Sequence, residues 1–239
     1  MKYIYKVVSC NDSSMFAQGK YHTIFKDHTV VKAFDYTDGF FCFRTFQEAY
    51  EYSRTGFKIK KLIPLSKVSK LKSMASMFSE KTINSFFEYH RQYFCDQPPK
   101  GTVSCKDIFV VGDCDLTKEN LTNRVKIQYK VIKHRHSVMA PGKYTVNYNK
   151  HEVSKAYPGS VGVMSFSTKK LAEIFIRDHE STTGADIVRV VPLSHAKRVK
   201  YITCGYDEDW MDDFYRGRMN GSKNIPSSTV FNDSVFVLD

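Results

Sequence analysis

The chemistry that this sequence offers most clearly is phosphate binding by lysine and arginine. Six lysines and no acidic residue lie between Phe57 and Met74, and four Lys/Arg residues and no acidic residue lie between Ile187 and Thr203. When such an unneutralised array binds a nucleic-acid backbone it releases condensed counterions, and each phosphate contact adds to the affinity. The pattern therefore predicts two basic strips that contact phosphates.

The predicted nucleic-acid-binding residues are basic side chains, with tyrosines beside them that could stack on bases. They are Lys61, Lys67, Lys70, Lys72, Arg189, His195, Arg198 and Lys200 in the strips, and Lys20, Lys143, Lys32, Lys155, Tyr21 and Tyr144 elsewhere. Phe34, Tyr157 and Tyr201 offer further aromatic faces. The alternative is a merely solvated basic surface, in which Lys and Arg stems cover apolar groups and the aromatic residues belong to the core.

These residues correspond in pairs because the chain contains an internal repeat. Residues 19–52 align with residues 142–175 without a gap and share 11 of 34 positions. The segments Tyr5–Val8 and Tyr129–Ile132 also match, as do two Pro-Leu-Ser motifs that begin at Pro64 and Pro192. We infer an ancient tandem duplication, with one copy in residues 1–118 and the other in residues 124–239.

The two copies share basic residues but not acidic ones. In the ungapped segments 2–8, 19–52 and 58–72, seven of twelve basic residues remain basic in the second copy, and none of five acidic residues remains acidic. Random substitution on solvated faces would remove basic and acidic residues at similar rates, so the difference favours a polyanionic partner. The retained pairs are Lys2/Lys126, Lys6/Lys130, Lys20/Lys143, Lys32/Lys155, Lys61/Arg189, Lys70/Arg198 and Lys72/Lys200.

The elements that would position these residues predict an α+β fold, in which each copy is a small mixed sheet with about two helices. Regular βαβ alternation, which would indicate a doubly wound fold, is missing. A last strand closes each copy. The other expected strands are Tyr3–Ser9, Lys20–Phe25, Gly39–Phe43 and Phe57–Ile63 in the first copy, and Lys126–Lys133, Lys143–Asn147, Gly162–Phe166 and Asp186–Val191 in the second.

Thr45 and Glu48 have the spacing of a capping box and predict a helix whose apolar stripe holds Phe46, Ala49 and Tyr50. Its counterpart carries Leu171, Ala172, Phe175 and Ile176. Second helices are expected near Glu80–Phe94 and Asp207–Met219, and a linker at residues 115–124. The acidic residues that begin the Asp207 helix would complement its dipole, and they could also mask or orient the basic strip of the second copy.

The composition indicates a folded protein in the host or cell cytoplasm. The net charge of +11 and the pI near 9.2 favour nucleic acid, nucleotides or anionic membrane as partners. The sequence has no apolar run long enough to span a membrane and no apolar segment of a signal peptide at its start. The six cysteines form no C-x-x-C motif and none recurs in both copies, so we expect free thiols.

Motifs for enzymatic chemistry are missing: no P-loop, G-x-G-x-x-G, H-E-x-x-H or G-x-S-x-G occurs. His134 and His136 lack partner ligands nearby, so we expect no metal site and no cofactor. The acidic run from Asp207 could chelate a cation, although a helix start is the simpler interpretation. His28 and His151 are the one retained histidine pair, and a turn before a strand explains them better than catalysis does.

Gly39–Thr45, with Ala49 and Tyr52, resembles the stretch of ADP-ribosyltransferase-like proteins where a glycine-led strand meets a Thr/Ser-capped helix, and Gly162–Phe175 is similar. The whole repeat resembles small uncharacterised domains of phage and bacterial proteins more closely. The resemblance bears on the fold. The NAD-holding His or Arg motif and the late catalytic Glu of the transferases have no counterpart here, which argues against transferase activity.

We therefore predict a non-enzymatic, phage-type protein that binds nucleic acid, with RNA or single-stranded DNA preferred over duplex. Two weak sites on one chain would strengthen each other through effective concentration. Two alternatives remain: a pocketed domain that sequesters or modifies a nucleotide near His28 and His151, and an interaction protein that binds an acidic host or phage protein.

Overall fold

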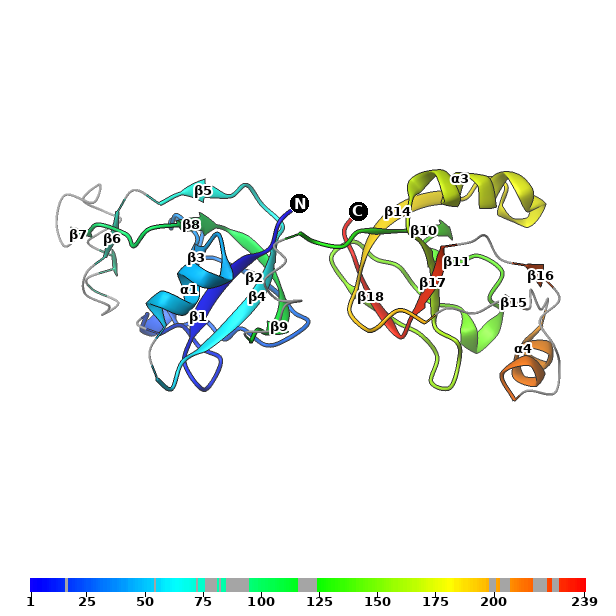
Figure 1. Cartoon of the computed structure of the whole chain (residues 1–239), viewed down its shortest axis with the longest axis horizontal. Coiled ribbons are helices and arrows are strands. Elements are labelled where there is room, and N and C mark those ends of the chain that lie inside the picture. The colour runs from blue at the N-terminus through cyan, green and yellow to red at the C-terminus, as the bar shows by residue number, and fades with distance from the viewer. Residues whose placement is uncertain are drawn as a thin grey trace. The chain divides into compact units, whose positions relative to one another are not determined.

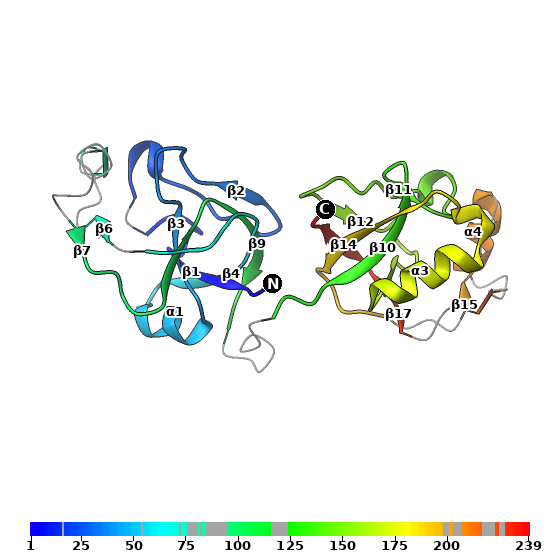
Figure 2. The same ribbon diagram turned by 90° about the horizontal axis from the view of Figure 1, so that it is seen from above.

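The structure, a computed structural model, divides into two compact units: unit 1, Met1–Val125, and unit 2, Lys126–Asp239 (Figures 1 and 2). It describes residues 1–15, 17–53, 55–71, 73–75, 81, 83–84, 95–115, 124–197, 201–202, 207–216, 223–224 and 228–239. Within these residues it is a mixed α+β protein with three α-helices and one large antiparallel sheet of seven strands in each unit, which confirms the predicted fold class.

The first strand of unit 1 lies at the centre of its sheet. Across it the order is β2 (Val30–Lys32), β9 (Asp107–Asp113), β4 (Lys58–Pro64), β1 (Ile4–Val8), β3 (Phe40–Phe43), β8 (Thr102–Cys105) and β5 (Ser69–Lys70). A separate ladder joins β6 (Met74–Ala75) to β7 (Cys95–Asp96).

The unit 2 sheet has the same order of corresponding strands. It runs β12 (Val153–Lys155), β18 (Ser234–Val237), β14 (Asp186–Pro192), β10 (Gln128–Lys133), β13 (Val163–Phe166) and β17 (Thr229–Asn232), with β11 (His136–Ser137) also paired to β10. The register matches too, because Tyr5 lies opposite Lys61 and Tyr129 lies opposite Arg189. A small ladder joins β15 (Tyr201–Ile202) to β16 (Lys223–Asn224).

One helix lies on each large sheet, and a threonine begins each of them. In α1 (Phe46–Tyr52) the predicted capping box is confirmed: the Thr45 hydroxyl accepts from the Glu48 amide, and the Glu48 carboxylate accepts from the Thr45 amide. Thr168 caps α3 (Lys169–Asp178), which lies along β10, β13 and β14 (Figure 2). Phe46 and Ala49 are buried as expected, but placing Tyr50 on the apolar stripe was wrong, since it is 47% exposed.

The predicted second strands, Lys20–Phe25 and Lys143–Asn147, were wrong. Both segments begin instead with a 3₁₀ turn, η1 (Gly19–Tyr21) and η2 (Gly142–Tyr144), and the edge strands β2 and β12 follow later. Gly19 and Gly142 have positive φ, +59° and +52°, a conformation that glycine adopts without steric cost. The chain therefore turns at the point where the residues that follow each glycine predict a strand.

The third helix, α4 (Glu208–Tyr215), begins where the acidic run predicted a helix, and the Asp207 side chain caps it by accepting from the Trp210 amide over 2.9 Å. Another 3₁₀ turn, η3 (Glu180–Thr182), follows α3. The predicted helix near Glu80–Phe94 and the predicted linker fall largely outside the described residues. No helix in the described part of the chain is long and apolar enough to cross a membrane.

Candidate functional site

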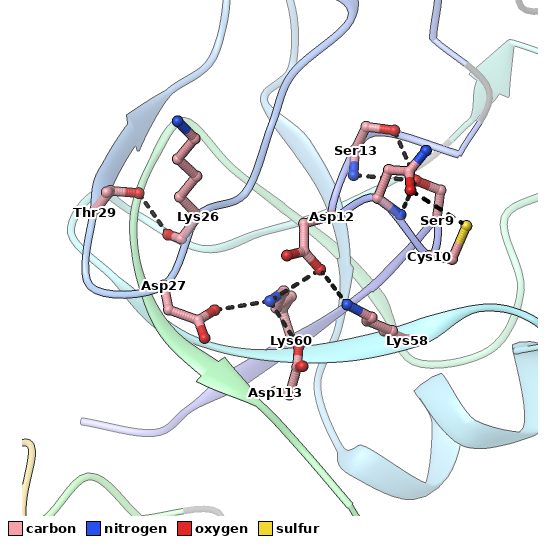
Figure 3. A network of polar contacts seen from close by, with 11 residues as sticks. Ser9, Cys10, Asp12, Ser13, Lys26, Asp27, Thr29, Lys58, Lys60 and Asp113 are labelled. Carbon is pink, nitrogen blue, oxygen red and sulfur yellow. Dashed lines mark hydrogen bonds and ion pairs between the residues drawn. The ribbon is translucent and has the colours of Figure 1, made fainter.

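Two lysines of the basic segment after Phe57 are paired with acids from distant parts of the sequence. The Lys60 side chain is 1% exposed and its ammonium lies within 3.1 Å of carboxylate oxygens of three aspartates, and Lys58 shares one of them (Figure 3). Burial alone would lower the pKa of Lys60, but these bonds outweigh burial and raise it. The three aspartates are Asp12, Asp27 and Asp113.

The remaining predicted strip residues of unit 1 do not form one line. Lys61 lies on β4, with its ammonium 4.3 Å from the centre of the Tyr3 ring. Lys70 lies on β5, and three other strands separate β5 from β4. Lys67 and Lys70 are exposed. Lys72 lies outside the described residues.

In unit 2 the Lys and Arg residues of the strip either form ion pairs or lie outside the described residues. Arg189 on β14 makes a bidentate ion pair with the side chain of Asp239, 50 residues away. Lys197 pairs with Asp233 over 2.7 Å, and His195 is exposed. Arg198 and Lys200 lie outside the described residues.

The structure instead brings the other predicted residues of unit 1 together around a cavity of about 290 Å³. The ammonium of Lys20 lies 5.2 Å from the ring centre of Tyr21 and 5.4 Å from that of Phe34. The two rings meet edge to face at 5.6 Å, and Phe34 is 44% exposed. Lys32 and Asp38 also line the cavity, and Leu71, next to Lys70, closes one side.

A buried lysine lies against the same cavity. Because Tyr5 packs on Phe46 of α1, the next residue of β1, Lys6, points to the opposite face of the sheet. Its ammonium donates to the carbonyl of Phe41 over 2.9 Å and lies 5.0 Å from the centre of the Phe25 ring. Lys6 is 7% exposed, and burial lowers its pKa.

Unit 2 repeats these parts around a smaller cavity of about 80 Å³. Lys143 lies 5.3 Å and 5.6 Å from the ring centres of Tyr144 and Tyr157. Lys130, the counterpart of Lys6, lies 5.4 Å from the Tyr148 ring and lines the cavity, and burial lowers its pKa to about 8. Each unit therefore has one surface lysine between two aromatic rings and one buried lysine behind it. Lys155, exposed on β12, has no place in the lining of this cavity.

The two cavities differ in what contacts the lysine and the tyrosine. In unit 2 the carboxylate of Asp212, on α4, accepts from the Lys143 ammonium over 2.8 Å and from the Tyr144 hydroxyl. These two bonds lower the pKa of Asp212. In unit 1 the Tyr21 hydroxyl donates over 2.6 Å to Asn84, whose side chain is neutral. The acidic run thus pairs with Lys143, which lies outside the basic strip that it was predicted to mask or orient.

Tyr144 is 7% exposed, so as a base-stacking face it is a poor candidate; Tyr157, at 40%, presents more of its ring. Lys6 and Lys130 were not among the site residues predicted from the sequence. Each lies in an apolar strand segment, Tyr-Lys-Val-Val or Tyr-Lys-Val-Ile, where a retained lysine indicates a buried amine rather than a surface charge.

The two retained histidines lie at turns. His28 and His151 have φ of +59° and +61°, and their amides donate to the carbonyls of Val110 and Val237 over 2.7 and 2.8 Å. Their rings stack on Phe109 and Phe236. His134, of the H-x-H motif, lies with Arg135 at the turn of the β10–β11 hairpin, both with positive φ.

Cys10, Cys42, Cys105 and Cys114 are free thiols. Comparison of the chain with protein-family models, with curated proteins and with solved structures gave no match.

Proposed function

We propose that the protein binds single-stranded nucleic acid, RNA in preference to DNA, without chemical conversion, and that one nucleotide enters the unit 1 cavity. The observation that carries this proposal is the position of Lys20 beside two aromatic rings at the edge of a 290 Å³ cavity. A nucleotide combines the two groups that such a site recognises, a flat aromatic base and an anionic phosphate.

The size of the cavity supports a single nucleotide. Small-molecule sites begin at roughly 300 Å³, so a cavity of about 290 Å³ is at the lower end of that range. Its lining is largely apolar, with Ala33, Phe40, Leu71 and Ile83 among its residues. Base stacking on an aromatic side chain contributes about 1–3 kcal/mol and tolerates any base, which suits binding without strong sequence preference.

Exposed lysines near the cavity supply contacts for the neighbouring phosphates. Lys32 lines the cavity, and Lys70 precedes the lining residue Leu71. A base can enter the cavity only after it leaves a helical stack, which favours single strands over duplex. This arrangement retains Lys20, Lys32, Lys70 and Tyr21 as site residues and gives no phosphate contact to Lys58 or Lys60.

The test is a binding titration with a fluorescent 20-nucleotide single-stranded RNA, the same sequence as DNA and the matching duplex. We expect the tightest binding for RNA, weaker binding for single-stranded DNA and the weakest for duplex. Adenosine and uridine monophosphates serve as competitors. If a monophosphate binds saturably with little salt dependence while the strands do not bind, the site takes a free nucleotide and the nucleic-acid proposal fails.

A further inference from the structure

Unit 2 contains an acidic side chain in the position where unit 1 would bind a phosphate. Lys143 and Tyr144 correspond to Lys20 and Tyr21 in the repeat, and their cation–ring distances agree within about 0.1 Å, 5.3 Å against 5.2 Å. In unit 2 both polar groups bind one carboxylate, that of Asp212. The structure thus displays an anion bound by this Lys-Tyr pair.

A second carboxylate completes the contact. Glu208, one turn before Asp212 on α4, accepts from the backbone amide of Lys143 over 3.1 Å. Its side chain fits there because residue 142 is glycine: a Cβ on Gly142 would overlap the Glu208 carboxylate. The anion contacts of unit 2 therefore come from an ammonium, a phenol and an amide of the turn η2, and η1 has a lysine and a tyrosine at the corresponding positions.

The helix that carries these acids also reduces the cavity. Met211 and Phe214 of α4 line the unit 2 cavity, which has about 80 Å³ against about 290 Å³ in unit 1. In unit 1 the group that accepts from the tyrosine is the amide of Asn84, which carries no charge to repel a phosphate. One unit thus has a neutral acceptor and a large cavity, and the other has a charged acceptor and a small one.

We infer that Lys20 forms the phosphate subsite of unit 1, beside the Tyr21 hydroxyl that donates to the neutral Asn84, and that Asp212 and Glu208 occupy the equivalent subsite of unit 2 as an internal anion that excludes ligand. This inference rests on the proposed function for the identity of the anion as a nucleotide phosphate. It assigns binding to unit 1 and leaves unit 2 closed. It also replaces the expectation of two weak sites with one binding site in unit 1 and, in unit 2, a site that the chain's own carboxylates occupy.

Inorganic phosphate tests the subsite without nucleic acid. The ¹⁵N-labelled full-length protein is titrated with phosphate, and the amide signals of Lys20 and Lys143 are followed by NMR. In the wild type we expect a saturable shift at Lys20 and none at Lys143. In Asn84→Asp, which copies the unit 2 acceptor into unit 1, the Lys20 shift should weaken by tenfold or more in apparent Kd.

The reciprocal variant is Asp212→Asn with Glu208→Gln, which keeps both side-chain shapes and removes both charges. We expect the Lys143 amide to gain a saturable shift. The matched control is Asp209→Asn with Asp186→Asn, which removes two exposed charges elsewhere in unit 2 and should leave Lys143 unresponsive. An equal wild-type response at Lys20 and Lys143, or no response at Lys143 in the reciprocal variant, would overturn the inference.

The outcomes separate the subsite from the proposed function. Phosphate shifts in the expected pattern, together with absence of RNA binding, would retain the subsite and reject nucleic acid as its source. RNA binding without any phosphate shift at Lys20 would retain the function and reject this subsite.

Discussion

The ammonium of Lys20 lies 5.4 Å from the centre of the Phe34 ring, at the edge of the unit 1 cavity. Lys143 and Tyr157 have the same relationship at 5.6 Å in unit 2. A cation beside an exposed ring can hold a phosphate and a base at once, and this pair carries the proposed function.

Replacement of Phe34 by alanine should weaken binding of single-stranded RNA. Loss of one stacking face removes about 1–3 kcal/mol, or roughly 5-fold to 160-fold in Kd. The control is Tyr36→Ala, which removes an aromatic ring that is 83% exposed and does not line the cavity. Equal losses of affinity in the two variants, measured by fluorescence anisotropy, would show that Phe34 contributes no more to binding than an exposed ring outside the cavity.

Replacement of Lys60 by methionine should destabilise the protein. The buried ammonium holds three carboxylates that are 31–56% exposed, so solvent screening reduces the loss to about 1–2 kcal/mol. Lys58→Met, which removes one of the bonds to Asp12, should cost less. Urea unfolding measures both; a K60M variant as stable as the wild type would contradict this assignment.

The same cluster predicts a pH dependence. Burial alone would raise the pKa of Asp12, but the bonds to Lys60 and Lys58 lower it. An acid whose pKa is lowered in the folded state stabilises that state above its ordinary pKa of 3.8 and loses this contribution as pH falls through the folded value. The stability difference between wild type and Lys60→Met should therefore be full at pH 6 and shrink below pH 3.8. A difference that stays constant down to pH 2 would exclude the ion pairs as its source.

Lys130 should give a second pH dependence of the same sign, at high pH. Its pKa falls from 10.5 to about 8 on folding because the amine is buried, so the unfolded chain binds the proton more tightly. Wild-type stability should therefore rise between pH 8 and pH 10, by at most about 1.4 kcal/mol per unit. Lys130→Met removes the titrating group and should lack this component. Parallel pH profiles for the two proteins would show that Lys130 remains charged when folded.

Replacement of Thr45 by alanine separates folding from binding. The capping box satisfies two backbone amides at the start of α1, and its loss should cost about 1 kcal/mol. Thr45 is absent from the lining of the cavity, so the affinity of the folded protein for RNA should be unchanged. A large loss of affinity in Thr45→Ala would mean that the helix, and not only the cavity edge, takes part in binding.

Local sequence signals predicted the elements whose causes are local. Thr45 and Glu48 predicted the start of α1 because a capping box needs only four residues, and Pro64 and Pro192 do end β4 and β14. The 3₁₀ turns at Gly19 and Gly142 were missed because the residues that follow each glycine also suit a strand. The positive φ of each glycine distinguishes a turn from a strand, and the sequence alone does not reveal that angle.

The site was harder to predict because its electrostatics are not local. Residues 57–74 contain no acid, yet Lys60 binds Asp27, 33 residues earlier, and Asp113, at the other end of the unit. In the same way Lys143 meets Asp212 across 69 residues. Positive charge shared between the two aligned segments placed Lys20 and Lys143 among the predicted residues, but whether a lysine faces solvent, an acid or a cavity depends on which strands are neighbours.

The most direct test of the central claim is the salt dependence of single-stranded RNA binding in wild type and in Lys20→Ala, with Lys58→Ala as the control. The wild-type affinity should fall steeply with salt, by about 0.7 log units per log unit of salt for each phosphate contact. Lys20→Ala should lower that slope by about 0.7, whereas Lys58→Ala should leave it unchanged. Absence of wild-type binding at low salt, or equal slopes for wild type and Lys20→Ala, would contradict the account.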